Sequence, residues 1–120
     1  MNPEELNTKG RSLSRGAYSL WSQKKLEDAL ILFQSSLQAF KQAYKIEPNN
    51  RHYELNVADS YLAMGQIAQQ LGKIDETTAY VEEGKNLVER VRKEYADSNH
   101  LAQVIRRHSI YFDVTGLTSE

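Results

Sequence analysis

The chain nearly repeats itself at a fixed spacing, and this internal similarity limits what it can fold into. Segment 25–28 (KLED) aligns with segment 73–76 (KIDE), and segment 50–53 (NRHY) aligns with segment 98–101 (SNHL). The period is 48 residues, because 73 − 25 = 48. A fixed period in this range is typical of stacked repeat architectures, which more often present binding surfaces than active sites.

The composition describes an ordinary globular domain. The 120 residues are 40% hydrophobic and 26% charged, which predicts one domain (1–120) with a core of its own. With 15 basic and 16 acidic side chains the net charge is −1, so no general electrostatic attraction to nucleic acid is expected. Cysteine is absent, which excludes disulfides, thiolate metal sites and thiol nucleophiles.

No targeting or membrane segment is expected. The N-terminal residues are polar and acidic, without the basic and apolar regions of a signal peptide. No apolar run approaches the roughly 20 residues that cross a bilayer. We therefore predict a cytoplasmic protein without membrane association.

Apolar residues at spacings of three and four predict five helices. They span about 7–22, 26–46, 51–71, 75–95 and 99–112. Pro48 ends the second helix, and Gly72 is expected to cap the third in the left-handed conformation. The tail, 113–120, is predicted to be flexible. Because the connections are short, neighbouring helices are expected to lie antiparallel.

Small and large residues recur on these helices in a family pattern. The first unit has Leu13, Gly16, Ala17, Leu20, Ala29, Phe33 and Ser36; the second has Tyr61, Met64, Gly65, Ala68, Gly72, Thr77, Val81 and Gly84. From about residue 13 to residue 112 the chain resembles the tetratricopeptide repeat (TPR). The family unit has about 34 residues, so each unit here is about four helical turns longer. Long-helix variants of this kind resemble the repeats of kinesin light chains and of some bacterial peptide-sensing regulators.

The resemblance implies an all-α, right-handed, TPR-like stack. Two antiparallel hairpins, about 7–47 and 51–95, would be followed by a capping helix at about 99–112. Ala17 and Gly65 would lie where the helices of each hairpin cross closely, and Phe33 and Val81 would fill the space beside them.

The resemblance also implies a function. In such stacks the first helix of each unit lines a concave groove that holds a partner peptide or helix. We therefore expect a non-catalytic protein–protein interaction module, an adaptor or scaffold. The expected groove residues are Arg11, Arg15, Tyr18, Trp21, Asp59, Gln66, Gln69, Arg107 and Tyr111, with Ser14, Leu62, Ala63, Gln70 and Ile110 on the same faces. For Tyr18 and Trp21 the alternative is that they close the end of the core.

One family function is not expected. Repeats that clamp the acidic C-terminal tail of chaperones carry lysine and asparagine at positions occupied here by Leu13, Ala17 and Ala63. Binding of chaperone tails is therefore not predicted, although the arginines of the groove favour an acidic peptide.

Neither catalysis nor a cofactor is predicted. The chain has no glycine-rich phosphate loop, no nucleophile elbow and no zinc-protease motif. His52 and His100 occupy equivalent positions, which indicates a shared feature of helix starts rather than a metal site. His108 has no carboxylate at ligand spacing along its own helix.

Two alternatives remain from the sequence. Ile110 and Phe112 have no obvious cover, so the last helix could form a homodimer, because an exposed apolar end of a stack favours association. Nucleic-acid binding is the weaker alternative, and it would use Arg90, Arg92, Lys93, Arg106 and Arg107.

Overall fold

The computed structural model describes residues 1–95 and 98–112, and within these ranges the chain is entirely helical. The helices are α1 (Pro3–Ser22), α2 (Leu26–Ile46), α3 (Arg51–Gln70), α4 (Ile74–Glu94) and α5 (Asn99–Arg107), followed by a 3₁₀ helix, η1 (Ser109–Tyr111). The prediction of an all-α fold with five helices is confirmed for the described residues. The predicted flexible tail, 113–120, lies outside them.

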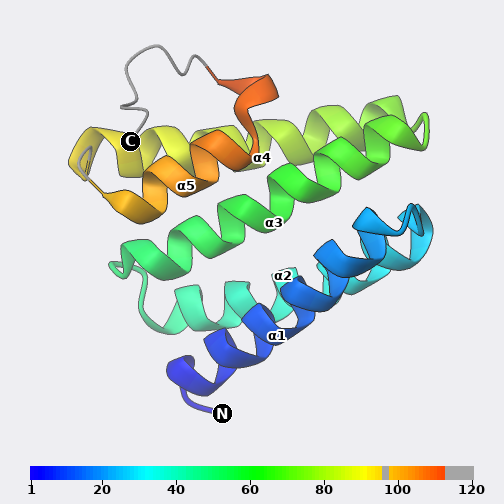
Figure 1. Cartoon of the computed structure of the whole chain (residues 1–120). Coiled ribbons are helices and arrows are strands. Elements are labelled where there is room, and N and C mark those ends of the chain that lie inside the picture. Colours follow the sequence, from blue (N-terminus) through cyan, green and yellow to red (C-terminus); the bar gives the residue numbers. More distant parts are fainter. Residues whose placement is uncertain (96–97, 113–120) are drawn as a thin grey trace.

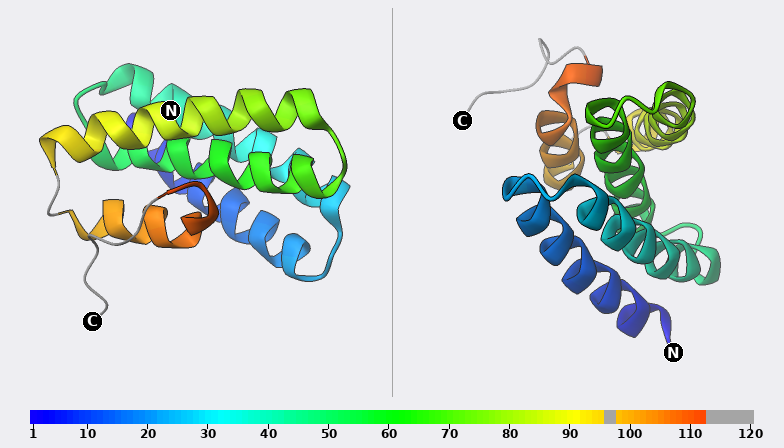
Figure 2. Two further views of the ribbon diagram at one scale, coloured as in Figure 1. Left: turned by 90° about the horizontal axis from the view of Figure 1, so that it is seen from above. Right: turned by 90° about the vertical axis from the view of Figure 1, so that its right-hand side faces the viewer.

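The helices pack as antiparallel pairs around α3 (Figure 1). α1 pairs with α2 and α3 pairs with α4, and α2 joins the two pairs by packing against α3. α5 lies against α3 and α4. Seen from above, α1 and α5 lie on one side of α3, and α4 lies on the other (Figure 2). The first helices of the two hairpins and α5 therefore share one side of the molecule.

Turns and caps recur at the spacing that the sequence predicts. Lys24 in the first hairpin and Gly72 in the second both adopt the left-handed conformation, with φ of 62° and 77°. Their positions are equivalent, since 72 − 24 = 48. Asn50 accepts backbone hydrogen bonds at the start of α3, and its equivalent, Ser98, accepts one from Leu101 at the start of α5. The internal similarity therefore extends to the local backbone.

Two predicted helix ends are wrong. α1 begins at Pro3 rather than near residue 7, because Asn2 and Glu5 form a capping box in which each side chain accepts a hydrogen bond from the other's backbone N–H. α5 ends at Arg107 rather than near residue 112. His108 is already non-helical, with φ of −118° and ψ of 36°, and η1 follows it.

The core has two parts, separated by α3. On one side Phe33, Phe40 and Met64 belong to a buried cluster formed mainly by α1, α2 and α3. On the other side Leu62 and Ile105 belong to a cluster of α3, α4 and α5. Because α3 is covered on both sides, polar residues near its middle are buried unless they reach the surface that α1 and α5 leave open.

Gly84 is expected to be intolerant of a side chain. A Cβ atom there would lie 2.6 Å from Cγ of Leu62 and 3.2 Å from the backbone oxygen of Ala58. Because Leu62 is fully buried, it cannot easily move aside. We predict that Gly84→Ala lowers the free energy of unfolding by about 1–2 kcal/mol despite its better helix propensity. Urea unfolding measures this.

Gly16→Ala is the matched control for this substitution. Its Cβ would meet only the end of the half-buried Leu32 side chain, at 3.0 Å. Gly16→Ala should therefore change stability by less than about 0.5 kcal/mol or increase it. Equal losses in the two variants would contradict close packing at Gly84.

Candidate functional site

A hollow of about 480 Å³ opens on the side shared by α1, α3 and α5. We call it the groove. Its lining comes from α1 (Asn7, Arg11, Ser14, Arg15, Tyr18), from α3 (His52, Asn56, Asp59), from α5 (His100, Gln103, Arg107) and from Phe40 of α2. The groove is thus formed mainly by the first helix of each hairpin and by α5, and its lining is mostly polar or charged.

Five of the expected groove residues line this hollow. Arg11 and Arg15 are exposed on α1, Tyr18 is half-buried one turn further along, and Asp59 and Arg107 reach it from α3 and α5. Ser14, on the same face, also lines it. The structure therefore brings these residues together, and their role in binding stays a prediction.

The other expected positions lie elsewhere. Leu62 and Ala63 are fully buried in the core. The indole N–H of Trp21 donates to Gln70 (3.0 Å), and its ring packs edge-on against Phe33. Gln69 is exposed but does not line the groove.

Residues 110–112, which follow α5, are placed in two different ways. Tyr111 packs against the second core cluster, and its buried hydroxyl has no hydrogen-bond partner among the described residues. Phe112 packs against the same cluster, whereas Ile110 is 69% exposed. Of the two residues expected to self-associate, only Ile110 therefore presents a largely free apolar surface.

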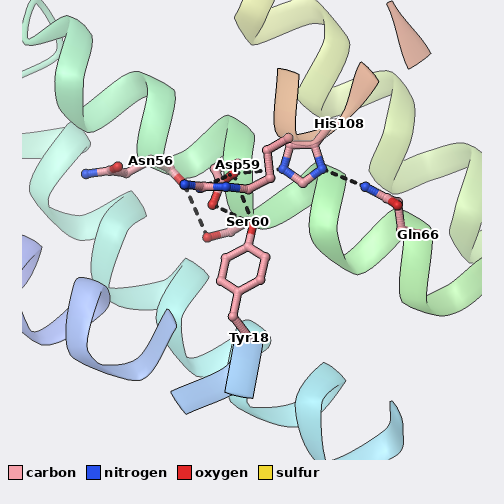
Figure 3. Close-up of polar contacts among 7 residues, drawn as sticks. Tyr18, Asn56, Asp59, Ser60, Gln66 and His108 are labelled. Carbon is pink, nitrogen blue, oxygen red and sulfur yellow. Dashed lines mark hydrogen bonds and ion pairs between the residues drawn. The ribbon is translucent and has the colours of Figure 1, made fainter. Parts of the chain in front are cut away.

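Asp59 is the centre of a buried polar network at the floor of the groove (Figure 3). Its side chain is almost wholly buried, and it accepts hydrogen bonds from three other residues. The Tyr18 hydroxyl donates at 3.0 Å, Nη1 of Arg107 at 3.0 Å, and Nε2 of His108 at 2.7 Å. Asp59 thus fastens α3 to both α1 and α5.

The Asp59 carboxylate stays ionised despite its burial. Burial alone would raise the pKa of the Asp59 carboxyl, but the hydrogen bond from His108 and the charge of Arg107 hold it below its usual value. Burial, and next the charge of Asp59, raises the pKa of the Tyr18 hydroxyl, which keeps it a donor. The charge of Asp59 also raises the pKa of Arg107 against the effect of burial.

His108 is a member of the Asp59 network that the sequence did not predict. Its ring is 0% exposed, and Nδ1 lies 2.8 Å from the amide nitrogen of Gln66. With Gln66 donating to Nδ1, the ring donates to Asp59 through Nε2. The sequence search for a carboxylate along the same helix could not find Asp59, which is 49 positions away. The acidic Asp59 among the apolar residues of α3 is a signal that could have indicated a buried partner.

His52 and His100 also join α3 to α5. Their Nδ1 atoms lie 2.9 Å apart, and the rings are nearly parallel, at 15°, with centroids 5.2 Å apart. The two nitrogens share one proton, because a donor on one ring needs an acceptor on the other. The equivalent positions of these residues are therefore more than a feature of helix starts. Among the described residues no group of three or more His, Asp or Glu could hold a metal ion.

The histidine contact predicts a loss of stability in acid. Burial, and next the neighbouring His52, lowers the pKa of His100 from 6.5 to about 4. Because the folded-state pKa is the lower one, unfolding takes up a proton as the pH falls through this window. We predict that the free energy of unfolding falls by about 1–2 kcal/mol between pH 6.5 and pH 4, allowing for solvent screening of the partly exposed ring. Urea titrations across this range measure it.

His100→Asn is the control for this pH dependence. In this variant the free energy of unfolding should change little between pH 6.5 and pH 4. The loss of stability below pH 3.8, the ordinary pKa of Asp59, should remain. An unchanged slope in the variant would show that His100 does not cause the effect.

Comparison with family models, with curated proteins and with solved structures found no match to this chain. No helix in residues 1–95 and 98–112 combines the length and the hydrophobicity needed to cross a membrane.

Proposed function

We propose that the chain is a non-catalytic protein-interaction module, an adaptor or scaffold that binds a partner peptide or helix in the groove. The observation that carries this proposal is the convergence of α1, α3 and α5 on one open hollow whose lining is mostly polar and charged. A TPR-like stack in which α5 serves as the cap would account for this arrangement and for the repeat period.

The network beneath the groove supports binding by a preformed surface. Asp59 ties Tyr18 of α1 to Arg107 and His108 at the end of α5, and the histidine contact ties the start of α5 to α3. Helices fixed in this way do not have to be ordered when a partner arrives, which lowers the entropic cost of association. Arginine and tyrosine are also the residue types that often dominate interface energetics.

The chemistry of the groove favours binding over catalysis. Asp59 is the one carboxylate among the described lining residues, and its oxygens already accept from three groups. An acid or base in catalysis must reach the reacting proton, whereas this carboxylate is buried beneath the surface.

The arginines proposed for nucleic acid are largely used within the protein. Arg90 is paired with Glu54 and donates to the Tyr44 hydroxyl, and Arg107 is paired with Asp59. Contacts of this kind leave less positive charge for phosphates. A protein partner therefore agrees better with the structure than nucleic acid does.

Selection of short random peptides on the immobilised protein tests the proposal. Peptides that bind wild type should lose binding to Gln103→Trp, because position 103 is exposed and the larger side chain would fill the groove. The matched control is Gln38→Trp, an exposed position of α2 on the hollow between α2 and α4. Loss of binding in the Gln38 variant alone, or in neither variant, would contradict the groove as the binding surface.

The exposure of Ile110 supports a second candidate function, assembly of a homodimer through the end of α5. Light scattering over a wide concentration range tests it. A dimer that Ile110→Asp dissociates would support this candidate, and a constant mass near 13.8 kDa would dismiss it.

A further inference from the structure

Two arginines lie side by side on α1, and no described residue pairs with their charges. Arg11 and Arg15 are exposed, lie one helical turn apart, and form no ion pair within the described part of the chain. The residues three and four positions away on the same helix are asparagine, threonine, serine and tyrosine, so no carboxylate of α1 offsets them. Like charges at this spacing repel each other, so the free protein keeps an unfavourable contact that an anion would relieve.

The opposite wall of the groove adds a third guanidinium. Arg107 uses Nη1 for Asp59, and its side chain remains 47% exposed. It lies over the Tyr18 ring, 5.2 Å from the ring centre, which fixes its position. Burial and the neighbouring His52 are the main causes that lower the pKa of His100. Among the weaker causes, the charge of Asp59 raises this pKa, and the charges of Arg107 and Arg11 lower it.

The negative charge of Asp59 does not cancel the positive charge that the groove arginines present to a ligand. Asp59 is buried and already neutralised by Arg107, which leaves Arg11 and Arg15 as excess charge on the opposite wall. The whole chain carries a net charge of −1, so the excess is local and does not follow from composition.

We propose that the groove selects an acidic peptide segment, whose carboxylates bind Arg11 and Arg15 on one wall and the exposed part of Arg107 on the other. This inference rests on the proposed function and names the chemistry of its partner. Arginine presents paired donors that match a carboxylate, and a partly desolvated site strengthens such hydrogen bonds. Asn56 and Gln103, which also line the groove, can donate to the peptide backbone.

The shape and surroundings of the groove favour a peptide over a nucleic acid. A hollow of about 480 Å³ between three helices accommodates a few side chains. A nucleic-acid strand requires a longer basic track than three arginines in one hollow provide.

Fluorescence anisotropy with a capped, labelled oligoglutamate peptide tests the inference, with an oligoglutamine peptide of equal length for comparison. We expect the glutamate peptide to bind more tightly, with an affinity that falls as salt rises. The double variant Arg11→Gln/Arg15→Gln should weaken its binding about tenfold. Lys85→Gln/Lys73→Gln is the matched control, because it removes the same charge from exposed positions outside the groove and should change little.

A second readout places the peptide. His100 lines the groove together with Arg11 and Arg107, so its ring and amide NMR signals should shift when oligoglutamate is added at neutral pH. This shift does not occur if the peptide binds on another face.

The outcomes separate this inference from the proposed function. Equal binding of glutamine and glutamate peptides in the groove would overturn the inference and leave the function standing. The same holds if randomly selected peptides bind the groove without enrichment in Asp and Glu. Tighter binding of an oligouridylate than of oligoglutamate would overturn the acidic-peptide assignment. Selected peptides that bind outside the groove would overturn both.

Discussion

Asp59→Ala is expected to lower the free energy of unfolding by about 3–5 kcal/mol, the cost of breaking a buried charged network by removing one partner. His108 is fully buried and would lose its acceptor, and the Tyr18 hydroxyl would lose the carboxylate to which it donates. Arg107 is half exposed and can be rehydrated, so the main loss falls on the other two groups. Urea or guanidinium unfolding measures the change.

Two variants sharpen this test. Asp59→Asn keeps an acceptor oxygen and the side-chain volume, so it should lose clearly less stability than Asp59→Ala. Asp28→Ala removes an exposed carboxylate from α2 and should stay within about 0.5 kcal/mol of wild type. A loss below about 1 kcal/mol for Asp59→Ala would show that the network does not hold α1, α3 and α5 together.

Phe33→Ala is expected to cost a similar amount, about 3–5 kcal/mol, because it leaves a cavity in the first core cluster. Phe33 is fully buried, and its ring packs edge-on against Tyr18, with centroids 4.9 Å apart, and against Trp21, at 6.2 Å. The same substitution should shift the NMR signals of Tyr18 and of groove residues beyond it. Chemical unfolding gives the energy.

Val81→Ala provides the comparison at the equivalent position of the second hairpin. Val81 is half-buried and packs at the crossing with Gly65, where a Cβ on the glycine would lie 2.7 Å from Cγ2 of Val81. Its truncation removes less buried surface and should cost about 1 kcal/mol. Equal losses at positions 33 and 81 would contradict the larger buried contact that the structure gives to Phe33.

The helices could be predicted from the sequence because the residue patterns that define them are local. Apolar spacing defines α2, α3 and α4 to within about one residue, and Gly72 adopts the left-handed conformation expected of it. The prediction of a close crossing at Gly65, with Val81 beside it, agrees with the structure. The predicted start of α1 near residue 7 missed the capping box that Asn2 forms with Glu5.

Long-range contacts could not be predicted in the same way. The end of α5 depends on His108, which leaves the helix and donates to Asp59 across 49 positions of sequence. The sequence placed Asp59 on the groove face but gave no measure of its burial, which depends on how α1 and α5 pack against α3. His52 and His100 were recognised as equivalent, whereas their contact depends on the angle between two helices.

The most direct measurement is the set of backbone amide signals that move when a peptide selected on wild-type protein is added. Our account predicts shifts at Arg11, Arg15, Asn56 and Gln103, on the groove faces of α1, α3 and α5, and no change on the outer faces of α2 and α4. Shifts confined to the hollow between α2 and α4, or to the exposed end at Ile110, would contradict it.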